Sequence, residues 1–369
     1  MLRLAFKDLF HEKGRLLISL GGVATPLLLV LLLEGMFAGA SEQIVAYLEE
    51  TDAQVWVMQA GVSNMHMATS MVPGRALEEV RKVPGVEDAT PILYVNNFVE
   101  TGEQQWFSYI VGLPSGAPRG GPWRMAEGKA EPGPGEVILP QVLARRSDLS
   151  LGDQVIIMGR PFTIAGLSKG TFSMANSIAF LSYEDLAGLL AAPGMASYVL
   201  VTARPGVSPE ELARRIREQV AGVNALTSEA FADSDRRMAR QMGVDVIRMM
   251  ALVGFGVGVL VVGLAMYTAA TSRTREYGVM KAVGARKGYL LRLVSLQTAV
   301  VSLAGLALAV ALAYGLRPLI EGAVPEVALS YTSDSLVRVA AASLVIAFLA
   351  AALPAYRAAQ VEPMIAFKE

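Results

Sequence analysis

Few residues of this 369-residue chain have side chains that carry out covalent or metal chemistry. Cysteine is absent, which excludes thiolate catalysis, cysteine-based zinc sites and disulfide bonds. The two histidines are His11 and His66, and a serine–histidine–aspartate triad outside the membrane would need His66. The phosphate-binding sequence G-x-x-x-x-G-K-[ST] does not occur. We therefore expect a protein that is not an enzyme, with no catalytic residues and no cofactor of its own.

Soft metal ligands cluster in the segment Met65-His66-Met67, with Met58 and Met71 close by in the sequence. Thioether and imidazole groups are ligands that copper accepts. The alternative is an apolar loop in which methionine fills space or contacts lipid or a hydrophobic ligand. The methionine and alanine content fits this second interpretation better, and we expect no metal site.

A basic stretch, SRTREYGVMKAVGARKG at 272–288, lies between two apolar segments of membrane length. It carries five basic side chains and a single acid, Glu276. Apolar residues recur between the charges at helical intervals, which predicts a short amphipathic helix. A helix placed between two membrane segments can transmit force from a soluble protein into the membrane. The basic and apolar residues concerned are Arg273, Arg275, Lys281, Arg286, Lys287, Val279, Met280, Ala282 and Val283.

The composition indicates a membrane protein with a large aqueous part. Hydrophobic residues make up 53% of the chain and the mean hydropathy is +0.44, which is too apolar for an ordinary soluble protein. A helix needs about 20 apolar residues to cross a bilayer. Four stretches approach this length: 16–37, 249–271, 293–316 and 336–353. The net charge of −1 gives no sign of a nucleic-acid partner.

Lysine and arginine near the ends of these stretches predict their orientation, because they concentrate on the cytoplasmic side. Four lie in residues 1–15, six in 272–292 and one in 317–335. We therefore expect a plasma-membrane protein whose N-terminal segment, loop 272–292 and C-terminal tail 354–369 are cytoplasmic. Residues 38–244 and the loop 317–335 would then lie outside.

The first apolar stretch leaves two questions open. Residues 38–40, Ala-Gly-Ala, resemble a signal-peptidase site, but the apolar run 16–33 is longer than that of a signal peptide, so we expect a retained anchor. Glu34 is the only acid in the four stretches and falls near the outer membrane interface. It is either a hydrated interfacial carboxylate or, with Met36 and Phe37, part of a lateral entrance that contacts cargo.

Small residues on the apolar stretches predict close helix packing, since lipid offers no hydrophobic drive for helix association. Gly254 and Gly258 form a G-x-x-x-G sequence, and Gly305 and Ala309 belong to a small-residue stripe. Packing within one chain and contact between the two chains of a dimer both fit this pattern.

The outer segment alternates strands and helices in two similar halves, at about 50–113 and 194–228. In each half a helix ending in VRKVPGV or REQVAGV leads into a strand. Two such halves suggest a ferredoxin-like α+β unit. Residues 114–193, rich in glycine and proline and then in strand formers, are expected to be an inserted β-rich subdomain. Residues 228–248 predict a stalk helix that continues into the second membrane stretch, since no proline interrupts it.

One membrane helix, a large outer domain and three further helices form a layout that resembles FtsX-like ABC transporter permeases of the MacB and LolC type. The sequence RTREYGVMKAVGA at 273–285 is similar to that family's signature. The ending PAYRAAQVEPMIAF at 354–367 and the turn VPGV at 83–86 are similar to parts of it as well. The residues at the most characteristic positions of the signature are Glu276, Gly278, Lys281, Gly284 and Ala285.

The resemblance implies a membrane α-helical fold of four transmembrane helices in a 1+3 arrangement, with the α+β domain between helices 1 and 2. It also implies a second permease chain, identical or paralogous, and a separate ABC ATPase that binds ATP and Mg²⁺. Residues 273–285 would then form a coupling helix docked on the ATPase. The contact residues would be Arg273, Arg275, Glu276, Tyr277, Gly278, Val279, Met280, Lys281, Val283, Gly284 and Ala285.

The same resemblance leaves two functions open. In the first, ATP hydrolysis drives export or extraction of an amphiphilic cargo, with membrane lipid and an extracytoplasmic adaptor protein as further partners. In the second, the chain is a transmembrane regulator that activates an extracytoplasmic partner such as a cell-wall hydrolase. A membrane-anchored enzyme is disfavoured because the sequence offers no catalytic constellation.

Overall fold

The computed structural model describes residues 13–66, 68–102, 104–173, 177–272, 274–324 and 327–360. The chain divides into two compact units. One unit, here called the helical unit, contains the residues up to Gly39, Gly243–Val324 and the residues from Leu329 onward. The other, the α+β unit, contains Ala40–Met242 and Pro325–Ala328.

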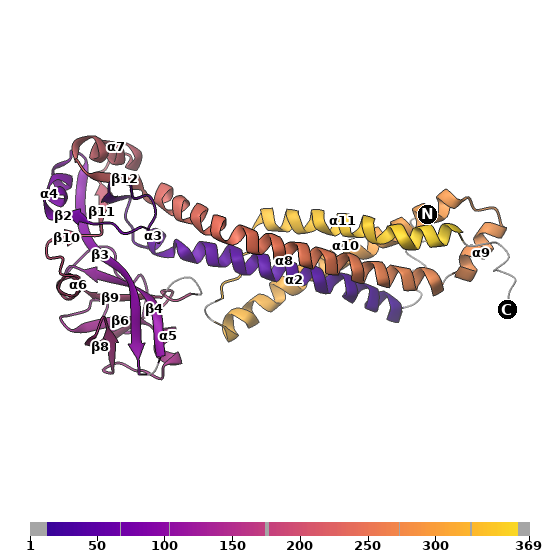
Figure 1. The fold of residues 1–369 in the computed structure, drawn as a ribbon, viewed down its shortest axis with the longest axis horizontal. Helices are drawn as coiled ribbons and strands as arrows, with labels where there is room; N and C mark the ends of the chain where they lie inside the picture. The colour runs from indigo at the N-terminus through magenta and orange to yellow at the C-terminus, as the bar shows by residue number, and fades with distance from the viewer. Residues whose placement is uncertain are drawn as a thin grey trace. The chain divides into compact units, whose positions relative to one another are not determined.

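Long helices account for most of the helical unit (Figure 1). Within the described residues, two segments are long and apolar enough to cross a membrane, Leu20–Ile44 and Lys287–Ala323. A shorter apolar stretch, Leu252–Val261, lies in a third helix. The helices are α2 (Lys13–Ile44), α8 (Ser228–Ser272), α9 (Thr274–Ala282), α10 (Lys287–Ala323) and α11 (Ser333–Gln360).

The connection 272–292 contains the expected short helix, and the expected loop 317–335 is partly helical as well. The segment 272–292 contains α9 and the first turns of α10, which begins at Lys287. At its other end α10 continues into 317–335 and ends at Ala323. There Arg317 Nε lies 3.0 Å from Glu321 Oε1, and this carboxylate also accepts the N–H of Leu329 at 2.9 Å. Such i,i+4 pairs favour helix, which accounts for the extension.

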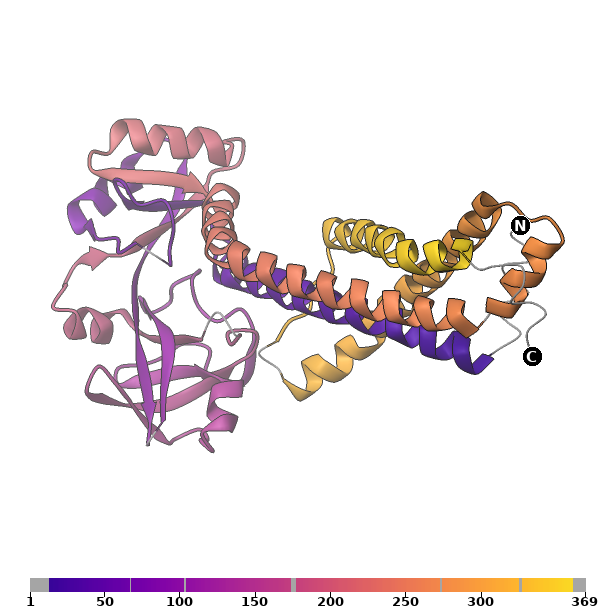
Figure 2. The same cartoon turned by 45° about the vertical axis from the view of Figure 1, so that its right-hand side comes forward.

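The core of the helical unit is apolar. Side chains of α2, α10 and α11 form one buried cluster, and α2 and α8 run side by side in both views (Figures 1 and 2). The buried members are Val23, Ala24, Leu27, Leu31, Val301, Ala309, Ala313, Val339 and Ile346.

The α+β unit begins and ends with strands in a ferredoxin-like order. The strands β1 (Val55–Gln59), β3 (Val86–Thr101), β11 (Tyr198–Ala203) and β12 (Val223–Thr227) lie in the order β12-β1-β11-β3, with all neighbours antiparallel. Helix α4 (Gly74–Lys82) connects the first two, and helix α7 (Pro209–Gln219) connects the last two. The start of α7 follows from its sequence, because the hydroxyl of Ser208 accepts the N–H of Glu211 and Pro209 occupies the first turn.

The intervening segment extends the same sheet, which differs from the expected separate insert. The strand β3 is 16 residues long, and it pairs with β11 along its first part and with β4 (Gln104–Leu113) along its second. The ten-stranded sheet continues through β4, β9, β6, β8 and β5, with β7 beside β3 and β8. One long strand therefore joins the two parts of this unit. The added elements are β5 (Met125–Gly128), β6 (Glu136–Pro140), α5 (Gln141–Arg146), β7 (Gln154–Ile157), β8 (Arg160–Ser168), β9 (Ile178–Ser182) and α6 (Tyr183–Leu189).

Both faces of the ferredoxin-like part are covered, which explains why β1 is apolar at successive positions. Val55 and Val57 face a core built with α4 and α7. Trp56 and Met58 face the opposite core, which contains Phe231 near the start of α8 and residues of α3 (Ala46–Glu50). This second core places the start of α8 directly against the sheet.

Candidate functional site

The helix α9 presents a mixed polar and apolar face to solvent. Arg275, Glu276, Val279, Ala282 and Val283 are all exposed, and Val283 retains 84% of its accessible surface. Their spacing of i, i+1, i+4, i+7 and i+8 puts them on one side of a helix. This exposed stripe, here called the open face of α9, combines an ion of each sign with three apolar side chains.

The opposite side of α9 packs on α10. Tyr277, 3% exposed, forms a cluster with Leu290 and Val294 of α10, and Met280 packs at its edge. We had expected Met280 to lie with Val279 and Val283 at a contact with another protein. It packs instead at the edge of the inner cluster, because it lies three residues after Tyr277 and so on a neighbouring part of the helix surface.

A glycine ends α9 and sets the direction of the chain into α10. Gly284 has φ +101, a left-handed conformation that favours glycine. Its N–H bonds to the carbonyl of Lys281, and the N–H of Ala285 bonds to that of Met280, both at 2.9 Å. This is the hydrogen-bond pattern of a Schellman cap. Gly284 and Ala285 therefore shape the end of α9.

The structure also describes Gly278 and Lys281, which belong to the expected coupling set. Gly278 is buried on the side of α9 that faces away from the open face. Lys281 is half-buried. Arg273 lies outside the described residues.

The small residues of the apolar stretches contact other helices of the same chain. A Cβ added to Gly254 would lie 2.6 Å from Val30 of α2, and one added to Gly258 would lie 2.9 Å from Ile346 of α11. A Cβ added to Gly305 would lie 2.5 Å from the side chain of Val23, a separation that real side chains do not adopt. Ala309 is fully buried in the same cluster. These contacts correspond to the first of the two expected roles, packing within one chain.

Glu34 is paired, which differs from the expected hydrated carboxylate. Its side chain is 13% exposed, and Oε2 lies 3.2 Å from the guanidinium of Arg338 on α11. Arg338 also pairs with Asp334 one turn earlier. Met36 and Phe37 are half-buried nearby in the sequence. The pairing lowers the cost of a carboxylate at this position, because it supplies the opposite charge.

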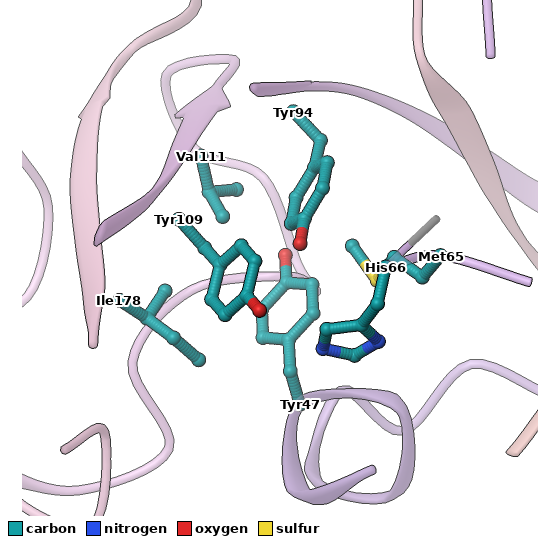
Figure 3. A pocket seen from close by; sticks show the side chains of 7 residues that line it. All are labelled: Tyr47, Met65, His66, Tyr94, Tyr109, Val111 and Ile178. Carbon is teal, nitrogen blue, oxygen red and sulfur yellow. The ribbon is translucent and has the colours of Figure 1, made fainter. Parts of the chain in front are cut away.

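A buried polar cluster lies in the α+β unit, around a small cavity (Figure 3). Asp235 of α8, 1% exposed, accepts the N–H of Met65 at 3.0 Å and lies 3.3 Å from Nδ1 of His66. Burial and the charge of Asp235 raise the pKa of Tyr109 to about 12, so this phenol stays neutral. The Tyr47 hydroxyl, whose pKa is raised by burial, donates to the carbonyl of Gly120 at 2.8 Å. Tyr94, Val111 and Ile178 complete the lining.

Sequence reasoning missed this cluster, although a signal was present. Phe231, Ala232 and Asp235 have the spacing i, i+1, i+4 of one helical face, so an acid stands on the apolar side of α8. Met65, which we considered as a copper ligand or a ligand contact, is 2% exposed in the core. Met67 lies outside the described residues. The cavity measures about 10 Å³, the size of one water molecule, so it does not hold a hydrophobic ligand in this conformation.

The pentapeptide GLSKG at 166–170 fits the nucleophile-elbow pattern G-x-S-x-G. Ser168 is 1% exposed at the end of β8, and its hydroxyl contacts the carbonyl of Leu139 and the hydroxyl of Thr171. A nucleophile needs an exposed hydroxyl on a strand-to-helix turn with a histidine in reach. Ser168 therefore has a structural role, and the only histidine within the described residues, His66, pairs with Asp235.

Comparison with known families agrees with this architecture. The MacB-like periplasmic core domain matches residues 16–219, and the FtsX-like permease C-terminal domain matches residues 248–363. Because the first match alone covers more than half of the chain, the chain belongs to the FtsX/MacB-type family of ABC transporter permeases. It is a membrane protein and, as a permease, a non-enzymatic membrane subunit.

Individual relatives are distant. An uncharacterized ABC transporter permease of Mycobacterium bovis is 26% identical, and the alignment covers 100% of this chain and 99% of that one. The pyoverdine export ATP-binding/permease protein PvdT of Pseudomonas aeruginosa is 22% identical over 99% of this chain and 58% of its own length. The solved periplasmic region of MacB from Actinobacillus actinomycetemcomitans superposes on 52% of this chain with 10% identity and a TM-score of 0.38.

Proposed function

We propose that this chain is the permease subunit of an ABC transporter and that a separate ATPase drives it to export or extract an amphiphilic cargo. The observation that carries the proposal is the open face of α9. It leaves apolar surface and both signs of charge exposed on a helix that is anchored by Tyr277 and ended by Gly284. An exposed patch of this kind on a rigid support marks a protein contact.

In the proposed topology, α2, α8, α10 and α11 supply four membrane spans in a 1+3 arrangement. The plasma membrane holds the chain with both ends and α9 in the cytoplasm and the α+β unit outside. The distribution of lysine and arginine supports this orientation, and the length of α2 and α10 supports two of the spans.

The proposed motor is an ABC ATPase that carries ATP and Mg²⁺ and binds the open face. PvdT is named an ATP-binding/permease protein, and the present chain matches 58% of its length. A relative that is named for both ATP binding and permease function supports an ATP-binding partner for this permease. In the assembly, Arg275 and Glu276 make polar contacts with the ATPase, while Val279 and Val283 enter its groove.

Movement then passes from α9 along α8, which is one helix from Ser228 to Ser272, to the α+β unit outside. A second permease chain, identical or paralogous, completes the transporter. Cargo enters from lipid beside Glu34, Met36 and Phe37, where the Glu34–Arg338 pair offers both charges to an amphiphile's head group. The relative PvdT is named for pyoverdine export, which supports export of a small amphiphile.

The test reconstitutes the full chain with the ATPase of its own operon or organism and measures ATP hydrolysis with and without the permease. Glu276→Lys and Val283→Asp should each reduce the permease-dependent rate about tenfold or more, as loss of an interface hot spot does. The matched controls Glu87→Lys and Leu151→Asp, at exposed positions of the α+β unit, should leave it unchanged. Normal stimulation by both α9 variants would refute the proposed contact.

A second candidate function is activation of an extracytoplasmic protein without cargo. An exposed apolar patch on the α+β unit favours it, since Phe98 and Phe107 of the β3–β4 hairpin and Ile156 of β7 remain 45%, 50% and 43% exposed. The two phenyl rings pack edge to face at 5.8 Å. Such a patch suits a protein partner, either an adaptor of the transporter or an activated enzyme. ATPase stimulation by a purified extracytoplasmic protein, and not by amphiphiles, would favour this candidate.

A further inference from the structure

Among the described residues, Asp235 is the one charged side chain that is fully buried. It lies seven residues after the start of α8, so about two helical turns from the point where β12 leads into that helix. A buried carboxylate is costly unless hydrogen bonds and an opposite charge compensate it. Its partners therefore show what it holds in place.

Those partners belong to the loop that follows β1. Both carboxylate oxygens of Asp235 accept the N–H of Met65, at 3.0 and 3.2 Å, and His66 Nδ1 lies 3.3 Å away. Met65 itself is in the core, with 2% of its surface exposed. The loop is thus fixed to α8 by hydrogen bonds from a backbone N–H to a buried carboxylate, and such bonds are strong in a protein interior.

The contact continues from the loop into the sheet through aromatic rings (Figure 3). The imidazole of His66 meets the ring of Tyr109 edge-on, with centroids 5.1 Å apart. Tyr109, on β4, stacks on Tyr94 of β3 at 5.5 Å and 16°. The strand β3 is the one that joins both parts of the sheet, so the series Asp235–His66–Tyr109–Tyr94 links α8 to the centre of the α+β unit.

Phe231 and Ala232 add apolar contacts between α8 and the sheet, whereas the other ion pairs of this part of α8 are solvated. Arg236 pairs with Glu49 of α3 and with Asp233 of its own helix, and the glutamate is about half exposed. Exposed pairs of this kind contribute little. The adjoining cavity, about 10 Å³, is too small for an amphiphile, which leaves attachment, and not cargo binding, as the role of the cluster.

We propose that Asp235 and His66 are positioning residues that transfer movement of α8 to the sheet of the α+β unit. This proposal rests on the proposed function, because it names the place where the motion produced by the ATPase enters the outer domain. With the contact intact, the first turns of α8 and strand β4 move as one body. Without the contact, α8 moves and the sheet does not follow its movement.

The test uses the full chain in nanodiscs and its lack of native cysteine. Spin labels at Arg237→Cys on α8 and Gln105→Cys on β4 report the distance across the contact. Both positions are exposed. In the otherwise native chain the distance distribution should be narrow. Asp235→Ala should broaden it, and Asp235→Asn, which keeps an acceptor for the Met65 N–H, should restore part of the narrowing.

A matched control separates this role from a general loss of stability. Ser168→Ala removes a buried hydroxyl with two partners in another part of the same sheet, and it should leave the distance narrow. His66→Phe keeps a ring against Tyr109 but removes the imidazole nitrogen beside Asp235, so it serves as the second variant if Asp235→Ala does not fold. A narrow distribution in both His66→Phe and Asp235→Ala would overturn the proposal.

The second measurement adds the ATPase and nucleotide. In the native complex, a label at Gln105→Cys alone should show an ATP-dependent change between the two permease chains. In Asp235→Ala the change should be lost while the rate of ATP hydrolysis is kept, because α9 is untouched. Loss of hydrolysis together with movement would overturn the proposal. If the native permease stimulates no ATPase, the proposed function fails, while the distances measured without nucleotide still test the contact.

Discussion

The open face of α9 and the buried contact of Asp235 use charge in opposite ways. On α9, Arg275 and Glu276 are exposed beside apolar Val279 and Val283, and this is the surface that we propose binds the ATPase. Asp235 has its partners, Met65 and His66, within the same chain and away from solvent. The difference reflects solvation. A charge exposed to water costs little, whereas a charge buried in a core needs partners within the fold.

The largest effect is expected on the inner side of α9. Tyr277→Ala removes a ring that is 3% exposed against Leu290 and Val294, and loss of a buried aromatic costs about 3–5 kcal/mol. Helix α9 should detach from α10 and become sensitive to protease, with loss of ATPase stimulation. Val279→Ala, on the open face, should leave protease resistance unchanged. Equal sensitivity of the two variants would remove the distinction between the two sides of α9.

The buried contact should come next. Asp235→Ala leaves the buried N–H of Met65 without its acceptor and removes the carboxylate beside His66, and an unsatisfied buried donor costs up to about 3 kcal/mol. The midpoint of thermal unfolding of the α+β unit, followed by tryptophan fluorescence, should fall by several degrees. A midpoint equal to that of the native chain would mean that the carboxylate is hydrated in solution.

The cap of α9 should have an intermediate effect. At Gly284, φ +101 disfavours any residue with a Cβ, so Gly284→Ala should cost about 1–2 kcal/mol. Gly288→Ala is the matched control, because Gly288 lies within α10 with nothing within 4 Å of an added Cβ, and alanine there favours helix by about 1 kcal/mol. ATPase stimulation should fall in the first variant only. A fall in both would point to the helix–helix contact and not to the cap.

The smallest effect is expected at an exposed ion pair. Hydrogen bonds from Arg214 and Arg215 lower the pKa of Glu211 to about 2 from its ordinary value of 4.5. A carboxylate whose pKa is lowered in the folded state stabilises the fold at pH values above its ordinary pKa. This contribution is lost as the pH falls from 4.5 towards 2. Glu211→Gln should flatten that part of the pH–stability curve slightly, and salt should erase the difference. A large, salt-independent change would contradict the small contribution expected of exposed charges.

Much of the architecture could be predicted from local pattern. The hairpin of β3 and β4, the helices α4 and α7 and the cap at Ser208 follow from turn residues, alternation and Ser208-Pro209. The basic stretch at 272–288 correctly predicted a short helix, whereas the cap that Gly284 forms at its end was not predicted. These features depend on residues a few positions apart, so the sequence contains all the information they need.

Features that depend on distant residues could not be predicted in this way. Met65 and Asp235 are 170 positions apart, and nothing local relates them. The pairing of β4 with β9 merges the expected insert into one sheet. The pattern at 166–170 matches a catalytic sequence, yet Ser168 is buried. Each of these outcomes depends on which residues other segments bury or pair with, and that is a property of the folded chain.

The sequence by itself determined that this is a membrane protein without thiol chemistry, with a basic helix between apolar segments and an α+β region beside them. Helical periodicity, strand alternation and the length of an apolar stretch depend only on neighbouring residues. The tertiary structure alone decided which side of α9 stays open, that Glu34 finds Arg338, and that a carboxylate on α8 is buried against a distant loop. Burial and pairing of charge arise only when separate segments come together and exclude water.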